Sequence, residues 1–209
     1  MKPHILILLL VVAPSSSLFA QGTALHLGFN SSTSKYISSS PAAESLNQSL
    51  SSKPGWQIGV SHDFPISKTF SLEPRLLFIS RGFKTNVAGP IAPSNSDTRI
   101  STWYYLNVPL HFKANWNIGK TKFYVGLGPY LDIGLFTMLN IDGQKSRYTF
   151  DDWDMRTFTY GMSTVLGVEF DRFSVEAFYH HGLSSIEPTD RMKRVNRSKG
   201  LSIGYRLFK

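Results

Sequence analysis

The sequence predicts an all-β protein: an eight-stranded antiparallel up-and-down transmembrane β-barrel, preceded by a cleaved signal peptide. Three observations lead to this prediction. Apolar and polar residues alternate along segments of roughly ten residues or more, long and short connections between the segments alternate, and aromatic residues flank the short connections. About ten residues of tilted strand cross the hydrocarbon core of a bilayer, whereas strands of soluble proteins are usually shorter.

Composition narrows the class further. The chain has 209 residues, of which 42% are hydrophobic and 13% aromatic, and its formal net charge is +8. Because there is no cysteine, a disulfide framework, a thiolate metal site, a cysteine nucleophile and a lipidated N-terminal cysteine are excluded. No apolar run long enough for a membrane helix follows the N-terminus. The charge favours an anionic lipid surface as a partner and not nucleic acid, since no basic helical face or RNA-binding motif accompanies it.

The first residues have the pattern of a secretory signal. Lys2 supplies the positive start, Ile5–Val12 form an apolar region too short to span a bilayer, and small residues lead to a cleavage point after Ala20. We therefore expect residues 1–20 to be a signal peptide and residues 21–209 to be the exported barrel domain. A permanent N-terminal anchor is the alternative, which the short apolar region disfavours.

The alternation is clearest over Ile100–Trp116. Even-numbered positions such as Leu110 and Phe112 are apolar along this segment, and odd-numbered ones such as His111 and Lys113 are mostly polar. Such a period of two is typical of a strand with one apolar and one polar face. The same pattern predicts eight strands: Thr23–Ser31, Gly55–Phe64, Thr69–Lys84, Ile100–Trp116, Phe123–Phe136, Met155–Phe170, Phe173–Leu183 and Lys199–Phe208.

Connections of two kinds separate these strands. Three are tight turns, namely Pro65–Lys68, Asn117–Lys120 and Asp171–Arg172. Four are long and polar, namely Ser32–Pro54, Thr85–Arg99, Thr137–Asp154 and Ser184–Ser198. Strict alternation in a meander places all long loops at one rim and all short turns at the other, as in outer-membrane barrels, whose long loops face the cell exterior.

A few residues fit this pattern less well. Pro74, Pro109 and Pro129 fall inside strands, where each removes a hydrogen-bond donor from the sheet. We expect β-bulges to accommodate them. His62 falls on the apolar face, close to a turn.

Six aromatic residues flank the short turns and share the apolar face. We expect them to form one ring at one depth, the aromatic girdle of a membrane interface. The alternative is a set of core aromatics in a soluble sandwich. The six are Phe64, Phe70, Trp116, Phe123, Phe170 and Phe173.

Six charged residues fall on the opposite face near the same rim. Three acids and three bases in so narrow a space are expected to pair, because an unpaired buried charge is costly. We interpret the group as a structural plug of ion pairs; a proton or ion relay is the alternative. The cluster comprises Glu73, Arg75, Lys113, Glu169, Glu176 and Arg206.

Four segments resemble a known family in their order along the chain. Residues 72–78 with Arg81-Gly82, residues 105–110 (YLNVPL), residues 124–130 (YVGLGPY) and residues 175–179 with Gly182-Leu183 resemble strand motifs of the Bacteroidetes-type outer-membrane β-barrel domain, which includes PorT-like proteins. Phe178 stands where the family usually has arginine. The resemblance implies an outer-membrane barrel in a family whose members mostly have no assigned function.

Three further groups were weighed as sites. His180 and His181 precede Ser184 and Ser185, a combination that a lipid hydrolase would use if histidine activated the hydroxyl. The two histidines face opposite sides of one strand, which disfavours catalysis. Asp151, Asp152 and Asp154 are a weak calcium candidate because no glycine-containing loop frames them. Five basic residues are expected either to contact lipopolysaccharide phosphates or to be a solvated loop: Arg191, Lys193, Arg194, Arg197 and Lys199.

These observations favour a non-enzymatic outer-membrane barrel with a structural or interaction role and no large open pore. A place in a secretion or surface assembly is one form that this role could take. A lipid-acting hydrolase and a soluble lipocalin-like carrier are the alternatives. No cofactor or metal site is predicted. The expected partners are outer-membrane lipid and lipopolysaccharide, the barrel-assembly machinery during insertion, and proteins that meet the loops.

Overall fold

The computed structural model describes residues 22–38, 41–87, 97–141, 143–187 and 193–208. The expected signal peptide therefore lies outside the described residues. The elements are β1 (Thr23–Ile37), α2 (Pro41–Ser49), β2 (Leu50–His62), β3 (Phe64–Pro65), β4 (Phe70–Val87), β5 (Asp97–Ile118), β6 (Thr121–Ile141), β7 (Gln144–Tyr148), the 3-10 helix η1 (Asp151–Trp153), β8 (Phe158–Phe170), β9 (Phe173–Gly182) and β10 (Lys193–Arg206). Neither helical segment in the described part of the chain has the length and hydropathy that a membrane-crossing helix needs.

Within the described residues, eight long strands form a closed antiparallel wall. Each pairs with its neighbours in the order β2-β1-β10-β9-β8-β6-β5-β4, and the pairing of β2 with β4 closes the circle. The short strands β3 and β7 add to β4 and β6. This is the predicted eight-stranded up-and-down barrel, and closure leaves the wall without a free edge along its length.

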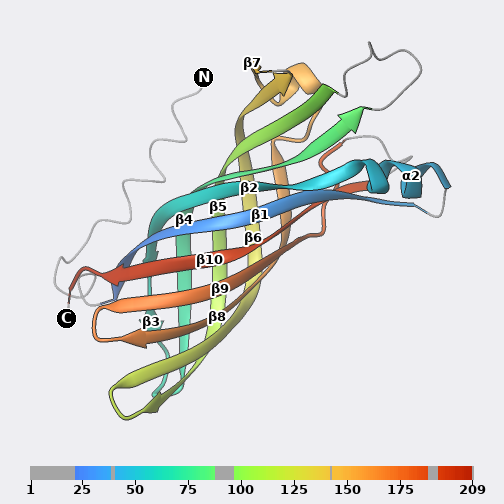
Figure 1. Ribbon diagram of the computed structural model, residues 1–209. Helices are drawn as coiled ribbons and strands as arrows, with labels where there is room; N and C mark the ends of the chain where they lie inside the picture. Colours follow the sequence, from blue (N-terminus) through green and yellow to red (C-terminus); the bar gives the residue numbers. More distant parts are fainter. Residues whose placement is uncertain (1–21, 39–40, 88–96, 142, 188–192, 209) are drawn as a thin grey trace, which may run out of the picture.

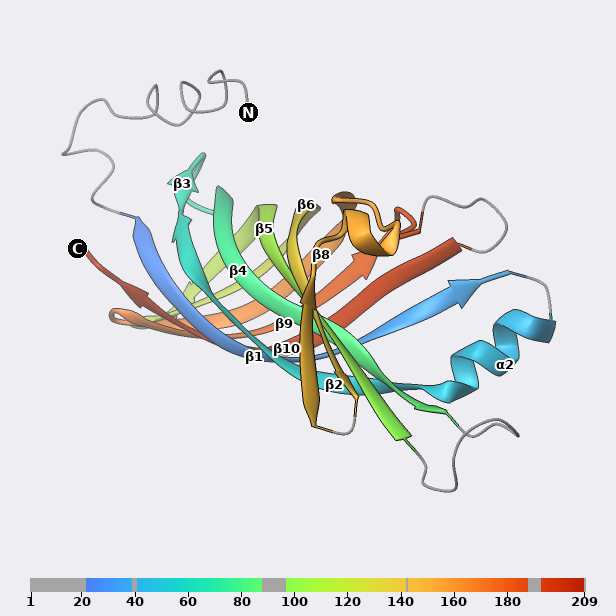
Figure 2. The same cartoon turned by 90° about the horizontal axis from the view of Figure 1, so that it is seen from above.

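The two ends of the barrel differ. The turns after β5 and β8 lie at one end, together with the start of β1 and the end of β10, and we call this the turn end (Figure 1). Gly119 and Asp171 in these turns have φ of 61° and 55°, the left-handed values that two-residue hairpins require. Helix α2, β7 and η1 lie at the opposite end, the loop end, and α2 projects beyond the wall (Figure 2).

Six of the eight long strands run further toward the loop end than predicted, whereas β8 begins at Phe158 and not at the predicted Met155, and β9 ends one residue early, at Gly182. β5 has 22 residues and β6 has 21, and β1 continues to Ile37 through a segment that we expected to be a loop. Ser32 and Ser34 in that segment point inward, and Ser32 donates a hydrogen bond to the Gly82 carbonyl. Alternation of apolar residues fades there because strands outside hydrocarbon need no apolar face, so the pattern underestimated their length.

The prolines do not produce the expected bulges. Pro74 pairs with Leu110 and Pro109 with Tyr130, and the register of both strand pairs is the same on either side. Pro129 pairs with Met162, and the β6–β8 register is likewise the same on either side. Shifts of register lie elsewhere, between Ser52 and Gln57 in the β2–β4 pair and at Tyr104/Tyr105 in the β5–β6 pair. A missing donor is therefore tolerated locally, without an inserted residue.

The apolar face of the sheet is outside and the charged face inside. Leu127 is 54% exposed and Ile203 59% exposed on the outer wall, while Glu176 and Arg81 in the interior are 1% and 0% exposed. A soluble carrier of lipocalin type requires the opposite arrangement, so that alternative is wrong. An apolar wall of this extent requires a nonaqueous surrounding.

Candidate functional site

The interior near the turn end is organised around Arg75 on β4. Its guanidinium donates to Glu176 on β9 at 2.6 Å through both terminal nitrogens, and to Glu73 at 2.7 Å. Tyr124 on β6 donates its hydroxyl to the Glu176 carboxylate at 2.6 Å. Lys113 on β5 lies 3.4 Å from Glu73. Two acids and two bases therefore compensate one another in a site closed to solvent.

Two histidines flank this group, and each is joined to a serine. His26 Nε2 lies 2.8 Å from the Ser61 hydroxyl, and His111 Nε2 lies 2.8 Å from the Ser163 hydroxyl. Neither histidine was among the predicted site residues, although strand parity places both on the inner face. All four side chains are buried, and the space of about 20 Å³ beside His26 is too small for a substrate.

The six predicted charged residues belong to one network of ion pairs, but their pairing differs from the prediction. Arg206 does not meet Glu176; it forms an ion pair with Glu169 at 2.7 Å close to the rim. Glu176 lies opposite Ser202 in the β9–β10 pair, four residues short of Arg206, or about 13 Å along a strand. Two residues outside the prediction link these parts: Asp63 lies 3.6 Å from Lys113 and 3.2 Å from Lys122, and Lys122 lies 3.8 Å from Glu169. The expected contact of Glu176 with Arg206 was wrong, because the inner face alone does not fix depth between neighbouring strands.

A second charged group lies further toward the loop end and was missed by the sequence analysis. Arg81 on β4 forms a very short ion pair with Asp132 on β6 and also contacts His180. Asn107 donates to the other Asp132 oxygen at 2.6 Å. Parity indicated that Arg81 and Asp132 share the inner face, yet only the register places them at one depth.

This group also decides the hydrolase alternative. His180 points into the barrel toward Arg81 and is 2% exposed. The Ser184 hydroxyl is bonded to the backbone of Tyr160, and the Ser185 hydroxyl accepts the backbone N–H of Arg194. Among the described residues, neither serine bonds to a histidine, and the arrangement required for an activated hydroxyl is missing.

The loop end is closed by an apolar plug. Phe150 and Met155, which flank η1, and Ile186 after β9 are buried against Trp103 and Tyr105 of β5. The segments are tied together by hydrogen bonds from Arg156 N–H to the Ile186 carbonyl and from Ile186 N–H to the Arg194 carbonyl. At Gly134 a Cβ would lie 2.7 Å from the Phe150 ring, so only glycine leaves room for the plug.

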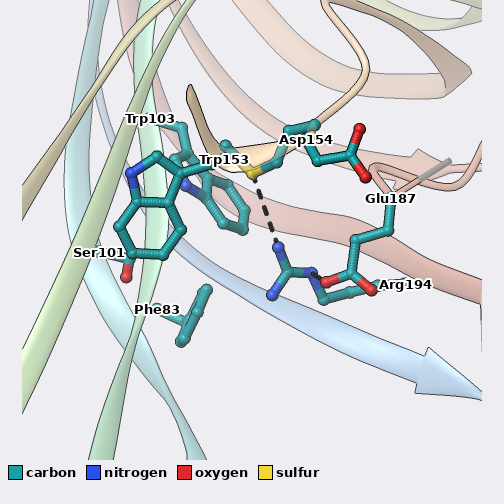
Figure 3. Close-up of a pocket in the computed structure, with 8 residues that line it drawn as sticks. Phe83, Ser101, Trp103, Trp153, Asp154, Glu187 and Arg194 are labelled. Carbon is teal, nitrogen blue, oxygen red and sulfur yellow. Dashed lines mark hydrogen bonds and ion pairs between the residues drawn. The ribbon is translucent and has the colours of Figure 1, made fainter. Parts of the chain in front are cut away.

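A cavity of about 280 Å³ opens above this plug (Figure 3). Arg194 of β10 lies at its side, close to Phe83, Trp103 and Met155, with its Nε 3.2 Å from Glu187. Neither of the two roles that the sequence left open for Arg194, a lipopolysaccharide contact or a solvated loop residue, fits the structure, because the side chain points inward and is largely buried. The rest of the lining is formed by Ser101, Trp153 and Asp154.

The other predicted basic residues are distributed along β10. Arg191 lies outside the described residues. Lys193 and Lys199 are exposed, and Arg197 is half-buried. Arg197 and Lys199 line a groove of about 320 Å³ on the outer wall, together with Tyr179 of β9 and four hydroxyl-bearing residues: Ser31, Thr33, Ser52 and Ser198.

The six predicted girdle residues all lie at the turn end of their strands. Phe64, Phe70, Trp116, Phe170 and Phe173 are exposed, and Phe123 is half-buried with its ring stacked 6.5 Å from Trp116. Their position at a lipid–water interface stays a prediction.

A second aromatic row lies nearer the loop end. It crosses four adjacent strands, with ring centroids 5.3 Å apart between Trp56 and Phe78, 5.8 Å between Phe78 and Tyr104, and 4.4 Å between Tyr104 and Phe136. Sequence analysis did not single it out.

The acidic residues around η1 do not gather into one site. The Asp152 carboxylate accepts the backbone N–H of Thr149 at 2.7 Å, and this hydrogen bond lowers the pKa of Asp152. Within the described residues, no group of three or more histidine or acidic side chains is placed to hold a metal ion.

A closed barrel with a charged, filled interior and an apolar outer wall is an integral membrane β-barrel. The chain belongs to the family described as outer membrane protein beta-barrel domain, whose model matches residues 19–187. It is accordingly a protein of the cell outer membrane.

Solved structures with a similar fold are distant in sequence. The attachment invasion locus protein Ail of Yersinia pestis, solved in complex with the heparin analogue sucrose octasulfate, is 13% identical with a TM-score of 0.43 and covers 88% of this chain and 98% of its own. Neisserial surface protein A is 14% identical with a TM-score of 0.41, at the same coverages of 88% and 98%. The N-terminal barrel domain of Pseudomonas aeruginosa OprF is 9% identical with a TM-score of 0.34, over 88% and 97%. No curated protein sequence matches the chain.

Proposed function

We propose that this protein is a non-enzymatic interaction barrel of the outer membrane, without a large open pore. The observation that carries the proposal is the filled interior: charged groups around Arg75 and Arg81 are followed by the apolar plug at the loop end. A space of only about 20 Å³ lies among the charged residues nearest the turn end, room for roughly one water molecule. Small barrels generally fill their own lumen in this way.

Planar-bilayer recordings test the absence of a pore. The purified protein should give no stable, large, ohmic conductance steps, because the plug and both charged layers obstruct the axis. A variant with Phe150→Ala tests whether the plug alone is the obstruction. It should also stay silent, since the layers around Arg75 and Arg81 remain. Large steps from the unaltered protein would refute the proposal.

The surface that we propose for interaction with lipid is the groove beside Arg197 and Lys199. Lys199 lies directly opposite Tyr179 in the β9–β10 pair, and next to it on the outer face is Leu201, which is 63% exposed. The positive charges thus lie where the apolar wall gives way to polar residues. This position would suit the phosphate groups of lipopolysaccharide, which charge-assisted hydrogen bonds would hold.

Binding of lipopolysaccharide to the detergent-solubilised protein tests this surface. Replacing both Arg197 and Lys199 by Gln should weaken binding on the order of tenfold, since two charged donors are lost. Lys145→Gln on β7 is the matched control, because Lys145 is also exposed but lies away from the groove. Dephosphorylated lipopolysaccharide should bind the unaltered protein as weakly as the double variant. Equal binding of lipopolysaccharide by the unaltered protein, the double variant and the Lys145→Gln control would exclude the phosphate contact.

A more specific role is supported only by the sequence motifs. Their likeness to PorT-like barrels favours a place in a secretion or surface assembly, with protein partners at the loop end and the barrel-assembly machinery engaged during insertion. Affinity purification of the intact protein from its outer membrane, with and without substitutions in the loop-end segments, would test for a stable assembly. Recovery of the barrel alone under gentle solubilisation would contradict it.

A further inference from the structure

The cavity at the loop end has a composition unlike the rest of the barrel. Its walls combine aromatic rings with both acidic and basic groups: Phe83 and Trp103 from the wall strands, Trp153 and Asp154 at η1, Glu187 after β9, and Arg194 of β10. Figure 3 shows these side chains gathered around one space from segments far apart in the sequence. The plug beneath them makes the cavity a blind pocket and not part of a channel.

Two of these side chains are held in place without being used by the fold. Trp153 is 44% exposed, and an edge-on contact with Tyr148 at 5.5 Å fixes its ring. Asp154 has a left-handed backbone with φ of 47°, which the Asp154 N–H stabilises by donating to the Asp151 carbonyl. Its carboxylate has no hydrogen-bond partner among the described residues. An exposed indole and an unengaged carboxylate at the mouth of a cavity are available to a ligand.

The side chains of the pocket disfavour three classes of ligand: anions, quaternary ammonium groups and acyl chains. Asp154 and Glu187 outnumber the single guanidinium of Arg194, so an anionic ligand is repelled. A quaternary ammonium group would need the aromatic faces, but Arg194 already lies 5.2 Å from the Trp103 ring and 5.5 Å from the Phe83 ring. An acyl chain would leave the Asp154 carboxylate desolvated without a partner and would offer no hydrogen bond to the Glu187–Arg194 pair.

We infer that this pocket binds one ring of a neutral saccharide. A pyranose ring has an apolar C–H face, which suits the Trp153 indole, and a rim of hydroxyl groups. Those hydroxyls can donate to the carboxylates of Asp154 and Glu187 and accept from Arg194. A volume of about 280 Å³ lies at the lower end of the range for small-molecule sites and suits a single ring with the remaining sugars outside.

This inference rests on the proposed interaction role but uses a different surface from the Arg197–Lys199 groove. The sugar could belong to the cell's own surface polysaccharide or to a glycan from outside the cell. Neutral oligosaccharides released from the cell's lipopolysaccharide, free of lipid and phosphate, represent the first source. A panel of unrelated neutral oligosaccharides represents the second. Binding from either set supports the inference and identifies the source.

The experiment is calorimetry or tryptophan fluorescence on the full mature protein in lipid nanodiscs. Trp153→Ala should weaken binding at least about tenfold, and Asp154→Asn several-fold, because stacking and a charged acceptor are lost. Trp153→Phe should retain most of the affinity. Heat-modifiable gel mobility should be the same for every variant, since both residues are outside the packed wall.

Two results would overturn the inference. One is that no neutral oligosaccharide binds, whether or not sulfated sugars or peptides do. The other is that binding is unaffected by both Trp153→Ala and Asp154→Asn. The Arg197/Lys199 double variant separates the two proposals: it should bind neutral sugars normally while losing lipopolysaccharide, so failure at one surface leaves the other testable.

Discussion

Arg75 holds together more of the barrel interior than any charge at the rim does. It joins β4 to β9 through Glu176, and Tyr124 joins the same carboxylate to β6. All three side chains are almost completely buried. Coulombic attraction in such a site only offsets the cost of removing charges from water, so the pair matters most when one partner is missing.

We predict that Arg75→Gln and Glu176→Gln each destabilise the folded barrel by about 3–5 kcal/mol, because each leaves an uncompensated buried charge. The double substitution should cost less than the sum of the two, since the residues are in direct contact. Unfolding by urea in lipid vesicles measures all three variants. Additive costs would mean that the bidentate contact is not present in the membrane.

The pair of Arg206 with Glu169 provides the control. The Arg206 and Glu169 side chains are 28% and 15% exposed, so water screens them and a much smaller effect is expected. The destabilising effects of substituting Glu176 and Arg206 should add, because the two side chains have different partners in the structure. The alternation along each strand predicted that these side chains point inward. Their pairings depend on the register between neighbouring strands, which the alternation within a single strand does not specify.

The strands show how far hydrophobic alternation can be followed. It predicted the number of long strands, their order and the three short turns, because hydrocarbon demands an apolar outer face over the membrane-spanning part. It failed at the loop end, where β1 extends to Ile37 and β10 begins at Lys193. It also gave no sign of α2, or of the plug around Phe150, because these depend on contacts between segments far apart in the chain.

We predict that the free-energy cost of placing a charge on the outer face of a strand depends on the depth of that position in the membrane. Arg at Leu127 or Ile203 should destabilise the barrel by about 2–4 kcal/mol, the range for a basic residue at the bilayer midplane. Ser146→Arg on β7 should have almost no effect, because Ser146 is exposed beyond the second aromatic row. Folding titrations in vesicles give the three values. Equal costs at all three positions would show that the apolar wall is not in lipid.

At the scale of the whole molecule, the distance between the girdle and the second aromatic row predicts the thickness of the bilayer that the barrel spans. On β5 the second aromatic row is represented by Tyr104 and the girdle by Trp116. Trp116 lies twelve residues after Tyr104, a separation of roughly 40 Å along a strand. At a tilt of about 45° this becomes close to 28 Å, the thickness of a bilayer's hydrocarbon core. We therefore predict that the rest of β5, toward Asp97, lies outside the membrane.

This placement leads to a depth profile that can be measured. Spin labels at Leu110, Leu127, Val168 and Ile203 should be reached by a lipid-soluble quencher and not by an aqueous one, because these residues lie on the outer wall between the two rows. A label at Lys145 should show the reverse, since β7 continues beyond the second row. The four wall positions should also differ in depth, with the accessibility ratio falling toward each row as lipid gives way to headgroups. Water accessibility along the whole wall would contradict the membrane placement. Lipid accessibility at Lys145 would instead mean that the barrel lies deeper than its aromatic rows indicate, which would remove the loop-end pocket from the aqueous side.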